Sequence, residues 1–206
     1  MVTTSLPFVV ISSRSEDPRL SRVDVDNIAA ARAIVAYLIA QGHQRIGVLS
    51  SEAEFGTFIA QRIQGWREAH EEAGLVPDER LIRLDLSSTG MLESHLDYLL
   101  QDLAKGECPT ALFVTRDRHA LEALMILAQR GIRVPEDLSV VGFDDLGPSS
   151  TANPPLTTVR QPIRRIGEVA AQLLLDRING NVPAGSLRLL ETEIMIRQSV
   201  GPPRSQ

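Results

Sequence analysis

Residues 131–145 read GIRVPEDLSVVGFDD, and this stretch decides the fold. Gly131 can end a helix in a left-handed conformation, and Pro135 prevents the helix from resuming. Residues 138–143 then form a short apolar run between turn signals, which is typical of a strand covered on both faces. Two adjacent aspartates follow at the carboxyl end of that strand, where open α/β sheets bind their ligands.

The chain on the amino side of this strand alternates helical and strand-like patterns over residues 26–141. Such alternation predicts a parallel sheet with helices on both faces, a doubly wound α/β lobe of four units. The predicted strands are residues 46–49, 81–84, 111–114 and 138–143. Outside this lobe, we expect a lone strand at residues 7–11, a helix at residues 163–178 and a final strand at residues 189–196.

Several short sequence blocks follow one another along the chain, and their order and spacing are informative when taken together. They are VDN at residues 25–27, GHQRIG at 42–47, RIQGW at 62–66, VPED at 134–137, PPLTT at 154–158 and IRQS at 196–199. In this order they resemble the effector-binding region of the LacI/GalR family of bacterial transcription regulators, over nearly the whole chain. The resemblance implies a periplasmic-binding-protein-like fold of type I, in which two α/β lobes flank a ligand cleft.

The resemblance also divides the chain between the two lobes. Residues 1–25 would be a remnant of the N-terminal lobe, and residues 26–160 the complete C-terminal effector-binding lobe. Residues 161–190 would return to the N-terminal lobe, and residues 191–206 would supply the final strand and tail of the C-terminal lobe. In the family, a DNA-binding helix-turn-helix and further units of the N-terminal lobe precede such a segment, and we expect both to be missing here. The lone strand and the returning helix would then lack sheet neighbours and leave apolar surface exposed.

Composition bounds the class of protein. The chain has 206 residues, 43% hydrophobic and 23% charged, which is typical of a globular protein with a substantial core. The net charge is −5 and the basic residues are scattered along the sequence, without the clusters that are typical of a nucleic-acid-binding surface. This segment alone should therefore not bind DNA. We read no secretion signal and no membrane span, and the single Cys108 cannot form an internal disulfide. We therefore expect a cytoplasmic protein.

Two side chains are candidates for effector contacts because each lies beyond the carboxyl end of a predicted strand. Arg62 carries forked guanidinium donors that suit a carboxylate or two adjacent sugar hydroxyls; without the resemblance it would be a solvated helix arginine. Asp144 matches the acidic residue that, in the family, accepts hydrogen bonds from effector hydroxyls or amines. The alternative role for such an aspartate is a turn or helix cap, which we assign to Asp145.

Further positions bear on the choice of effector. Arg116 stands where family members often have a small or amide residue; a cation facing the cleft would favour an anionic effector, but the side chain could equally face solvent. Leu86 lies where a stacking aromatic is common, and Ser12 where a polar or acidic contact is common, so no particular effector carries over. Asp117 follows a predicted strand and fits a helix N-cap.

Catalysis and metal binding find little support in the sequence. It contains no Gly-x-Ser-x-Gly elbow, no phosphate-binding loop and no dinucleotide fingerprint, and its four histidines are dispersed. We expect His43 to pack beside Gly42, and His70, His95 and His119 to lie at the surface of charged helices. No cofactor and no metal is expected.

The resulting hypothesis is an effector-sensing region that binds a sugar, sugar phosphate or sugar acid between the lobes and controls operator binding allosterically. DNA would be bound only through a helix-turn-helix absent from this chain, and the resemblance implies a homodimer. A sugar-binding protein of the periplasmic ribose-binding type, without a DNA-binding role, shares the fold and is the alternative. A small α/β enzyme using Asp144 and Arg62 is a third possibility, for which no nucleophile or metal set is evident.

Overall fold

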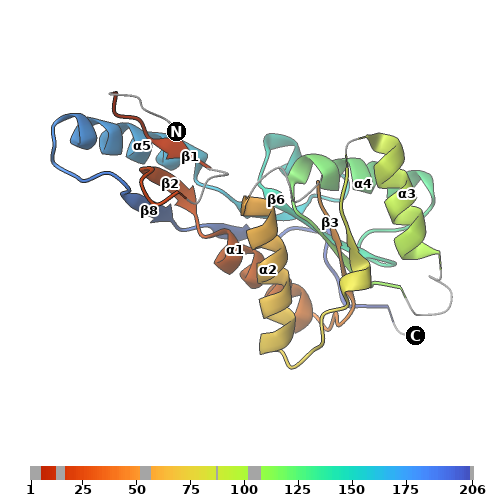
Figure 1. Ribbon diagram of the computed structural model, residues 1–206. Coiled ribbons are helices and arrows are strands. Elements are labelled where there is room, and N and C mark those ends of the chain that lie inside the picture. The colour runs from red at the N-terminus through yellow and green to blue at the C-terminus, as the bar shows by residue number, and fades with distance from the viewer. Residues whose placement is uncertain (1–5, 13–16, 52–56, 87, 102–107, 205–206) are drawn as a thin grey trace.

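The computed structural model describes residues 6–12, 17–51, 57–86, 88–101 and 108–204. Within them the strands form two separate sheets, one of six strands and one of three. Figure 1 shows the small sheet with one helix at one end of an elongated molecule, and the large sheet with the other helices at the opposite end. The expected α/β fold, with one large doubly wound lobe and a smaller second lobe, is confirmed.

The large sheet has the strand order β4-β3-β5-β6-β7-β9, and its neighbouring strands are parallel except for β7 and β9. The strands are β3 (Ile46–Leu49), β4 (Ile82–Arg83), β5 (Ala111–Val114), β6 (Ser139–Asp144), β7 (Thr157–Arg160) and β9 (Glu193–Met195). The helices of this lobe are α1 (Asn27–Ala40), α2 (Thr57–Glu72), α3 (Thr89–Leu100) and α4 (Asp117–Gln129). Strands β3 and β5 are buried over their full length, as continuous apolar runs in a parallel sheet require.

Two hydrophobic cores cover the two faces of the large sheet. One contains the inward side chains of α1 and α2, among them Ile34 and Trp66. The other contains those of α3 and α4, among them Leu96 and Leu127. Because successive strand residues point to opposite faces, each central strand contributes to both cores. Among the described helices, none combines the length and the apolar character that a membrane crossing requires.

The small sheet has the order β1-β2-β8 and consists of β1 (Val10–Ile11), β2 (Arg22–Val25) and β8 (Leu187–Leu190), all parallel. Helix α5 (Ile163–Ile178) covers it, with Ile166 and Leu173 packed against Val23 and Val25. The expectation that the lone strand and the returning helix lack sheet neighbours is therefore wrong. Strand β2 escaped recognition because only two of its four side chains are apolar and buried.

One predicted strand, residues 189–196, is two strands in different sheets. Strand β8 runs parallel to β2 in the small sheet, whereas β9 runs antiparallel to β7 in the large sheet. Glu191 and Thr192, between them, carry the chain from one sheet to the other. The chain also changes lobe between β2 and α1 and between β7 and α5, so three connections join the lobes within the described residues.

The last described residues close the large sheet. The Ser199 hydroxyl donates to the Val140 carbonyl oxygen at 2.6 Å and accepts from the Thr157 backbone N–H at 2.8 Å. His43 is buried, as expected, and its Nε2 lies 2.9 Å from the Gly201 carbonyl oxygen. This C-terminal segment thus joins the amino ends of neighbouring strands β6 and β7.

His70 is also buried, which corrects the expectation that it lies at the surface. Its ring centroid is 4.6 Å from that of Trp66, and its Nδ1 is 2.8 Å from the Trp66 carbonyl oxygen. The two residues are four apart on α2 and so share one face of that helix. The charge of the surrounding sequence does not reveal that this face packs inward.

Candidate functional site

Arg62 is the buried centre of the candidate site. It lies on α2 with an exposed fraction of 4%. Its Nε donates to Asn27 Oδ1 at 3.0 Å, its Nη1 donates to the Thr115 carbonyl oxygen at 2.6 Å, and its guanidinium stacks on the Phe143 ring. Burial lowers the pKa of Arg62 to about 10 although the nearby Asp144 opposes this shift, so the guanidinium is charged at neutral pH.

Asp144 ends β6 and faces Arg62. Its Oδ1 lies 3.7 Å from Arg62 Nη1 and accepts a hydrogen bond from Gln161 Nε2 at 2.7 Å. Burial raises the pKa of the Asp144 carboxyl, while Arg62 and Gln161 oppose the rise. The backbone φ of Asp144 is 126°, which is strained for a residue with a Cβ and is often found at ligand sites.

A cavity of about 190 Å³ opens beside these two side chains. Its lining residues come from both lobes. The small lobe contributes Ser12, directly after β1, and Asp24 of β2. The large lobe contributes Asn27, Phe58, Arg62, Arg116 and Asp144, and Gln161 comes from the connection after β7. The cavity therefore lies between the lobes, at the carboxyl ends of the large sheet's parallel strands. Larger cavities of about 560 and 440 Å³ lie at the opposite edge, around Arg45 and Asp78, and one of about 510 Å³ lies between α1 and the β8–β9 connection. None of the three contains a predicted site residue.

Four of the five predicted effector-binding residues line this one cavity, namely Arg62, Asp144, Arg116 and Ser12. Leu86 does not. It is 6% exposed and packs in the core beneath α3 and α4, because an apolar side chain at this turn is drawn into the adjacent core rather than the cleft. The role of the other four in binding an effector stays a prediction.

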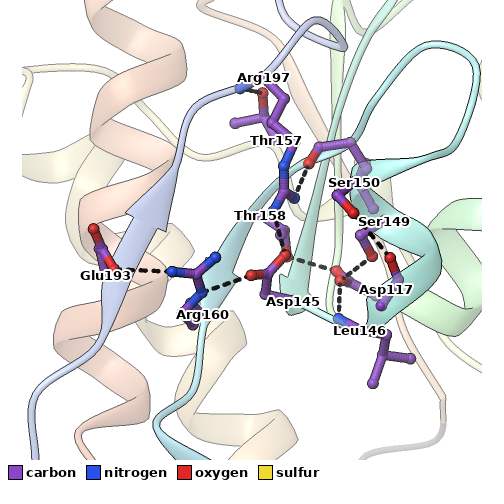
Figure 2. A network of polar contacts seen from close by, with 12 residues as sticks. Asp117, Asp145, Leu146, Ser149, Ser150, Thr157, Thr158, Arg160, Glu193 and Arg197 are labelled. Carbon is purple, nitrogen blue, oxygen red and sulfur yellow. Dashed lines mark hydrogen bonds and ion pairs between the residues drawn. The ribbon is translucent and has the colours of Figure 1, made fainter.

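Asp117 does not cap α4, which corrects its predicted role. Arg116 is the N-cap residue and makes no side-chain capping bond, and Asp117 is the first residue of the helix. The buried Asp117 carboxylate accepts hydrogen bonds from the Ser149 hydroxyl at 2.5 Å, the Thr158 hydroxyl at 2.6 Å and the Leu146 backbone N–H at 3.0 Å, as Figure 2 shows. It thereby holds the loop after β6 and the strand β7 against the start of α4.

Asp145 is likewise not a cap, but forms ion pairs. The short helix η4 (Gly147–Ser150) starts without a side-chain capping bond. The Asp145 carboxylate contacts Arg160 Nε at 2.7 Å and Arg197 Nη2 at 2.6 Å, and Arg160 reaches on to Glu193 at 3.4 Å (Figure 2). Burial acts to raise the pKa of Asp145, but the hydrogen bonds from both arginines outweigh it and hold that pKa below its usual value. This network ties β6, β7 and β9 together beside two of the lobe connections.

Two polar side chains at the small-lobe side of the cavity, Asp24 and Gln161, were not predicted. Asp24 lies in β2, which the sequence analysis did not recognise as a strand. Gln161 follows β7, another unrecognised strand, and the sheet register pairs Asp144 with Arg160, so Gln161 comes next to the end of β6. Both residues belong to or follow strands that pair with segments far away in the sequence. A local sequence pattern does not reveal such pairing.

Asn27 and Phe58 were also missed, although the sequence held signals for both. Asn27 is the last residue of the VDN block, and its Nδ2 donates to the Val25 carbonyl oxygen at 3.3 Å. Phe58 lies four residues before Arg62, so the two share a face of α2. The Phe58 ring centroid is 5.4 Å from the guanidinium carbon of Arg62 and 5.2 Å from that of Arg116. An aromatic side chain thus lines the cavity from a helix and not from the loop where we looked for one.

The lining residues combine hydrogen-bond acceptors and donors. The carboxyl groups of Asp24 and Asp144 accept, and the amides of Asn27 and Gln161 do both. Burial raises the pKa of Asp24, opposed by its hydrogen bond from the Val25 backbone N–H. This arrangement suits a polar ligand with several hydroxyl groups. Across the described ranges, no group of three histidine, cysteine, aspartate or glutamate side chains is placed to hold a metal ion.

Comparison with known proteins decides the family. The sequence model of the periplasmic binding protein-like domain matches residues 35–200. A regulatory protein of the LacI family from Chloroflexus aggregans has a similar solved structure, with a TM-score of 0.85 and 32% identity over 95% of this chain and 69% of that chain. This chain belongs to the LacI/GalR family. The resemblance seen in the sequence is thereby confirmed.

Curated members of the LacI/GalR family give the same result. The HTH-type transcriptional repressor CytR of Escherichia coli K12 is 36% identical over 194 residues, which are 94% of this chain and 55% of CytR. The solved complex of the transcriptional regulator CelR with cellobiose has a TM-score of 0.83 and 35% identity, over 94% of this chain and 58% of that chain. The chain therefore spans a little more than half the length of these regulators.

Proposed function

We propose that this chain is the effector-sensing region of a LacI/GalR-type transcription regulator and binds a small polar metabolite in the cavity between its lobes. The observation that carries the proposal is the buried Arg62, which faces Asp144 at 3.7 Å beside a cavity lined by residues of both lobes. On this proposal, residues 26–160 and 191–206 form the effector-binding lobe, and residues 1–25 and 161–190 belong to the other.

The chemistry of the lining supports a sugar-like effector. A carboxylate accepts two hydroxyl donors, and adjacent sugar hydroxyls present two such donors side by side. The names of two relatives agree with this: CelR is described in complex with cellobiose, and a LacI family regulator from Enterococcus faecium, 25% identical to this chain, with bound ribose.

The proposed mechanism is a change in the relative position of the lobes. Asp24 and Gln161 lie next to two of the three lobe connections, whereas Arg62 and Asp144 belong to the large lobe. A ligand that contacts both groups binds one lobe arrangement more tightly than another and shifts the population toward it. In the longer protein, as a homodimer, this shift would change the affinity of a helix-turn-helix outside this chain for operator DNA.

The test is calorimetry of the intact protein against a panel of monosaccharides, disaccharides, sugar acids, sugar phosphates and nucleosides. We expect at least one compound to bind, and Asp144→Asn to weaken it at least tenfold, because the amide replaces one acceptor by a donor. The matched control is Asp97→Asn, since the Asp97 side chain is 70% exposed on α3 and pairs with Arg130 at 2.8 Å. Binding that is unchanged by Asp144→Asn would place the effector elsewhere and refute the proposed site.

A further inference from the structure

We propose that Arg116 selects an effector that carries an acidic group, a carboxylate or a phosphate, in addition to hydroxyl groups. The inference rests on the proposed function, because it concerns the same cavity. It goes further by naming the residue that sets the charge of the effector.

The position of Arg116 brings it to the cavity. It comes directly before α4, beyond the carboxyl end of β5, and β5 is the sheet neighbour of β6, which ends at Asp144. Its backbone is extended, with φ −149° and ψ 136°, so the residue stands outside the helix. The side chain is half-buried and lines the cavity together with Arg62 and Asp144.

The other charged groups of the cavity already have protein partners. Arg62 donates to Asn27 and to the Thr115 carbonyl oxygen and faces Asp144. Asp144 accepts from Gln161, and the Asp24 carboxylate accepts from a backbone N–H at 2.8 Å. A ligand competes for these groups with contacts that exist before it arrives.

Arg116 differs from them. Within the part of the chain that the structure describes, its guanidinium makes no hydrogen bond and no ion pair. Its guanidinium carbon lies 5.2 Å from the centroid of the Phe58 ring. The five N–H donors of a guanidinium lose hydration when a ligand fills a cavity, so a half-buried arginine without a carboxylate needs an acceptor from the ligand.

Arg116 is the cation of the cavity lining that, in the described residues, has no carboxylate within ion-pair distance. Two arginines and two aspartates line it, and Asp144 is the carboxylate that faces Arg62. Burial raises the pKa of both Asp24 and Asp144, so these carboxyls hold negative charge less readily than exposed ones. The positive charge of Arg116 is therefore the charge that an acidic group of a ligand can neutralise.

Geometry and size define the ligand further. A guanidinium binds a carboxylate or a phosphate through two parallel N–H donors that are assisted by the opposite charge. Two adjacent hydroxyl groups can accept from the same donors but do not neutralise the charge. Asp144 and Gln161 remain in the same cavity for hydroxyl groups. The cavity of about 190 Å³ is smaller than the roughly 300–1,000 Å³ typical of ligand pockets. These features fit a single sugar ring that bears one acidic group.

The experiment compares matched pairs of ligands by calorimetry on the intact protein. The pairs are glucose and glucose 6-phosphate, glucose and glucuronate, and ribose and ribose 5-phosphate. Each is titrated into the wild type, Arg116→Asn and Arg118→Ala. Asparagine is a favoured N-cap residue, so Arg116→Asn should keep α4 intact, which a thermal melt checks. Arg118 is exposed on the same helix and serves as the control of equal charge.

We expect at least one acidic member to bind the wild type and the Arg118→Ala variant tenfold or more tightly than its neutral parent. Arg116→Asn should remove this preference, because it should lower the affinity of the acidic member more than that of its neutral parent. Preference for glucuronate or for a phosphate identifies which acidic group the site takes. Equal or tighter binding of neutral sugars, or a preference that survives in Arg116→Asn, would overturn the role of Arg116 and leave the proposed function standing. If no sugar derivative binds but a nucleoside of the wider panel does, the role of Arg116 is overturned and the proposed function stands. Failure of the whole panel to bind would overturn both.

Discussion

The guanidinium carbon of Arg62 lies 3.6 Å from the ring centroid of Phe143, the residue directly before Asp144 in β6. Together with its bonds to Asn27 and Thr115, this stacking fixes the side chain in one orientation. A ligand that binds Arg62 therefore does not have to order a flexible arginine, which is one of the usual costs of binding.

Replacing this arginine should weaken both binding and folding. In Arg62→Ala, we expect the effector affinity to fall by more than about 1.5 kcal/mol, the lower range for a hydrogen bond to a charged group. The free energy of unfolding should fall by about 3 kcal/mol, because the partly buried Asp144 carboxylate loses the guanidinium that faces it. Calorimetry measures the first quantity and urea denaturation the second.

Arg67→Ala is the matched control for Arg62→Ala. Arg67 lies on the same helix, is more exposed, and pairs with Glu79 at 2.6 Å away from the cavity. An exposed pair contributes at most about 1 kcal/mol, so this variant should fold and bind nearly as the wild type does. Equal losses in both variants would mean that the position of Arg62 in the cavity has no special role.

Asp117→Asn should destabilise the chain although it keeps the size of the side chain. The carboxylate accepts from three donors, and an amide turns one of its acceptor positions into a donor that faces another donor. We expect a loss of about 2 kcal/mol, the range for a buried polar group left unsatisfied. A urea midpoint no lower than that of the Asp97→Asn control would contradict this account.

Asp145 and Arg160 should contribute unequally to the network that they share. The Asp145 side chain is 8% exposed and holds two arginines, so Asp145→Asn should reduce the unfolding free energy by about 2 kcal/mol. The Arg160 side chain is 45% exposed, and Arg160→Ala leaves the Arg197 pair in place, so its effect should be smaller. Urea denaturation of both variants checks the order, and a larger loss in Arg160→Ala would reverse this assignment.

The buried His43 should make stability depend on pH. Burial lowers the pKa of His43 below its ordinary 6.5, opposed by its bond to Gly201. The unfolded chain therefore binds more protons than the folded chain once the pH falls through 6.5, and folding loses free energy there. The stabilising contribution is complete above pH 6.5 and is lost progressively below it. His70, whose pKa is also lowered by burial, acts in the same direction.

Unfolding measured at pH 7.5 and pH 5.5 tests this expectation. The loss of stability between the two values should be smaller in His43→Gln than in the wild type. In Gln44→Ala it should equal that of the wild type, because this variant changes the exposed residue next to His43 and no titratable group. A His43→Gln variant with the full wild-type loss would show that the acid sensitivity arises elsewhere.

The parts of the fold that the sequence predicted are those with a strong local signal. The predicted strands at residues 46–49 and 111–114 coincide with β3 and β5, because a strand buried on both faces is a continuous apolar run. Strands β2 and β7 were missed. Their short sequences mix polar with apolar residues, and they become strands through pairing with segments far away in the chain.

The residues of the candidate site also divide into those that the sequence predicts and those that it does not. Arg62 and Asp144 could be predicted, because each lies beyond a strand that the sequence reveals. Asp24 and Gln161 could not, because they reach the cavity only through the second sheet and the connections to it. The aspartate roles were assigned from local rules for helix caps, whereas the structure uses both carboxylates for contacts between distant segments.

The bonds that Ser199 and Gly201 make with Val140, Thr157 and His43 also bear on how the protein is made. A ribosome releases the large lobe's first strands long before it releases these residues and the neighbouring β9. Domains usually fold as units during synthesis, beginning with the amino-terminal part. In this chain the half around β3 and β5 can assemble early, but the β6 and β7 half has to wait until residues 193–201 have also been synthesised.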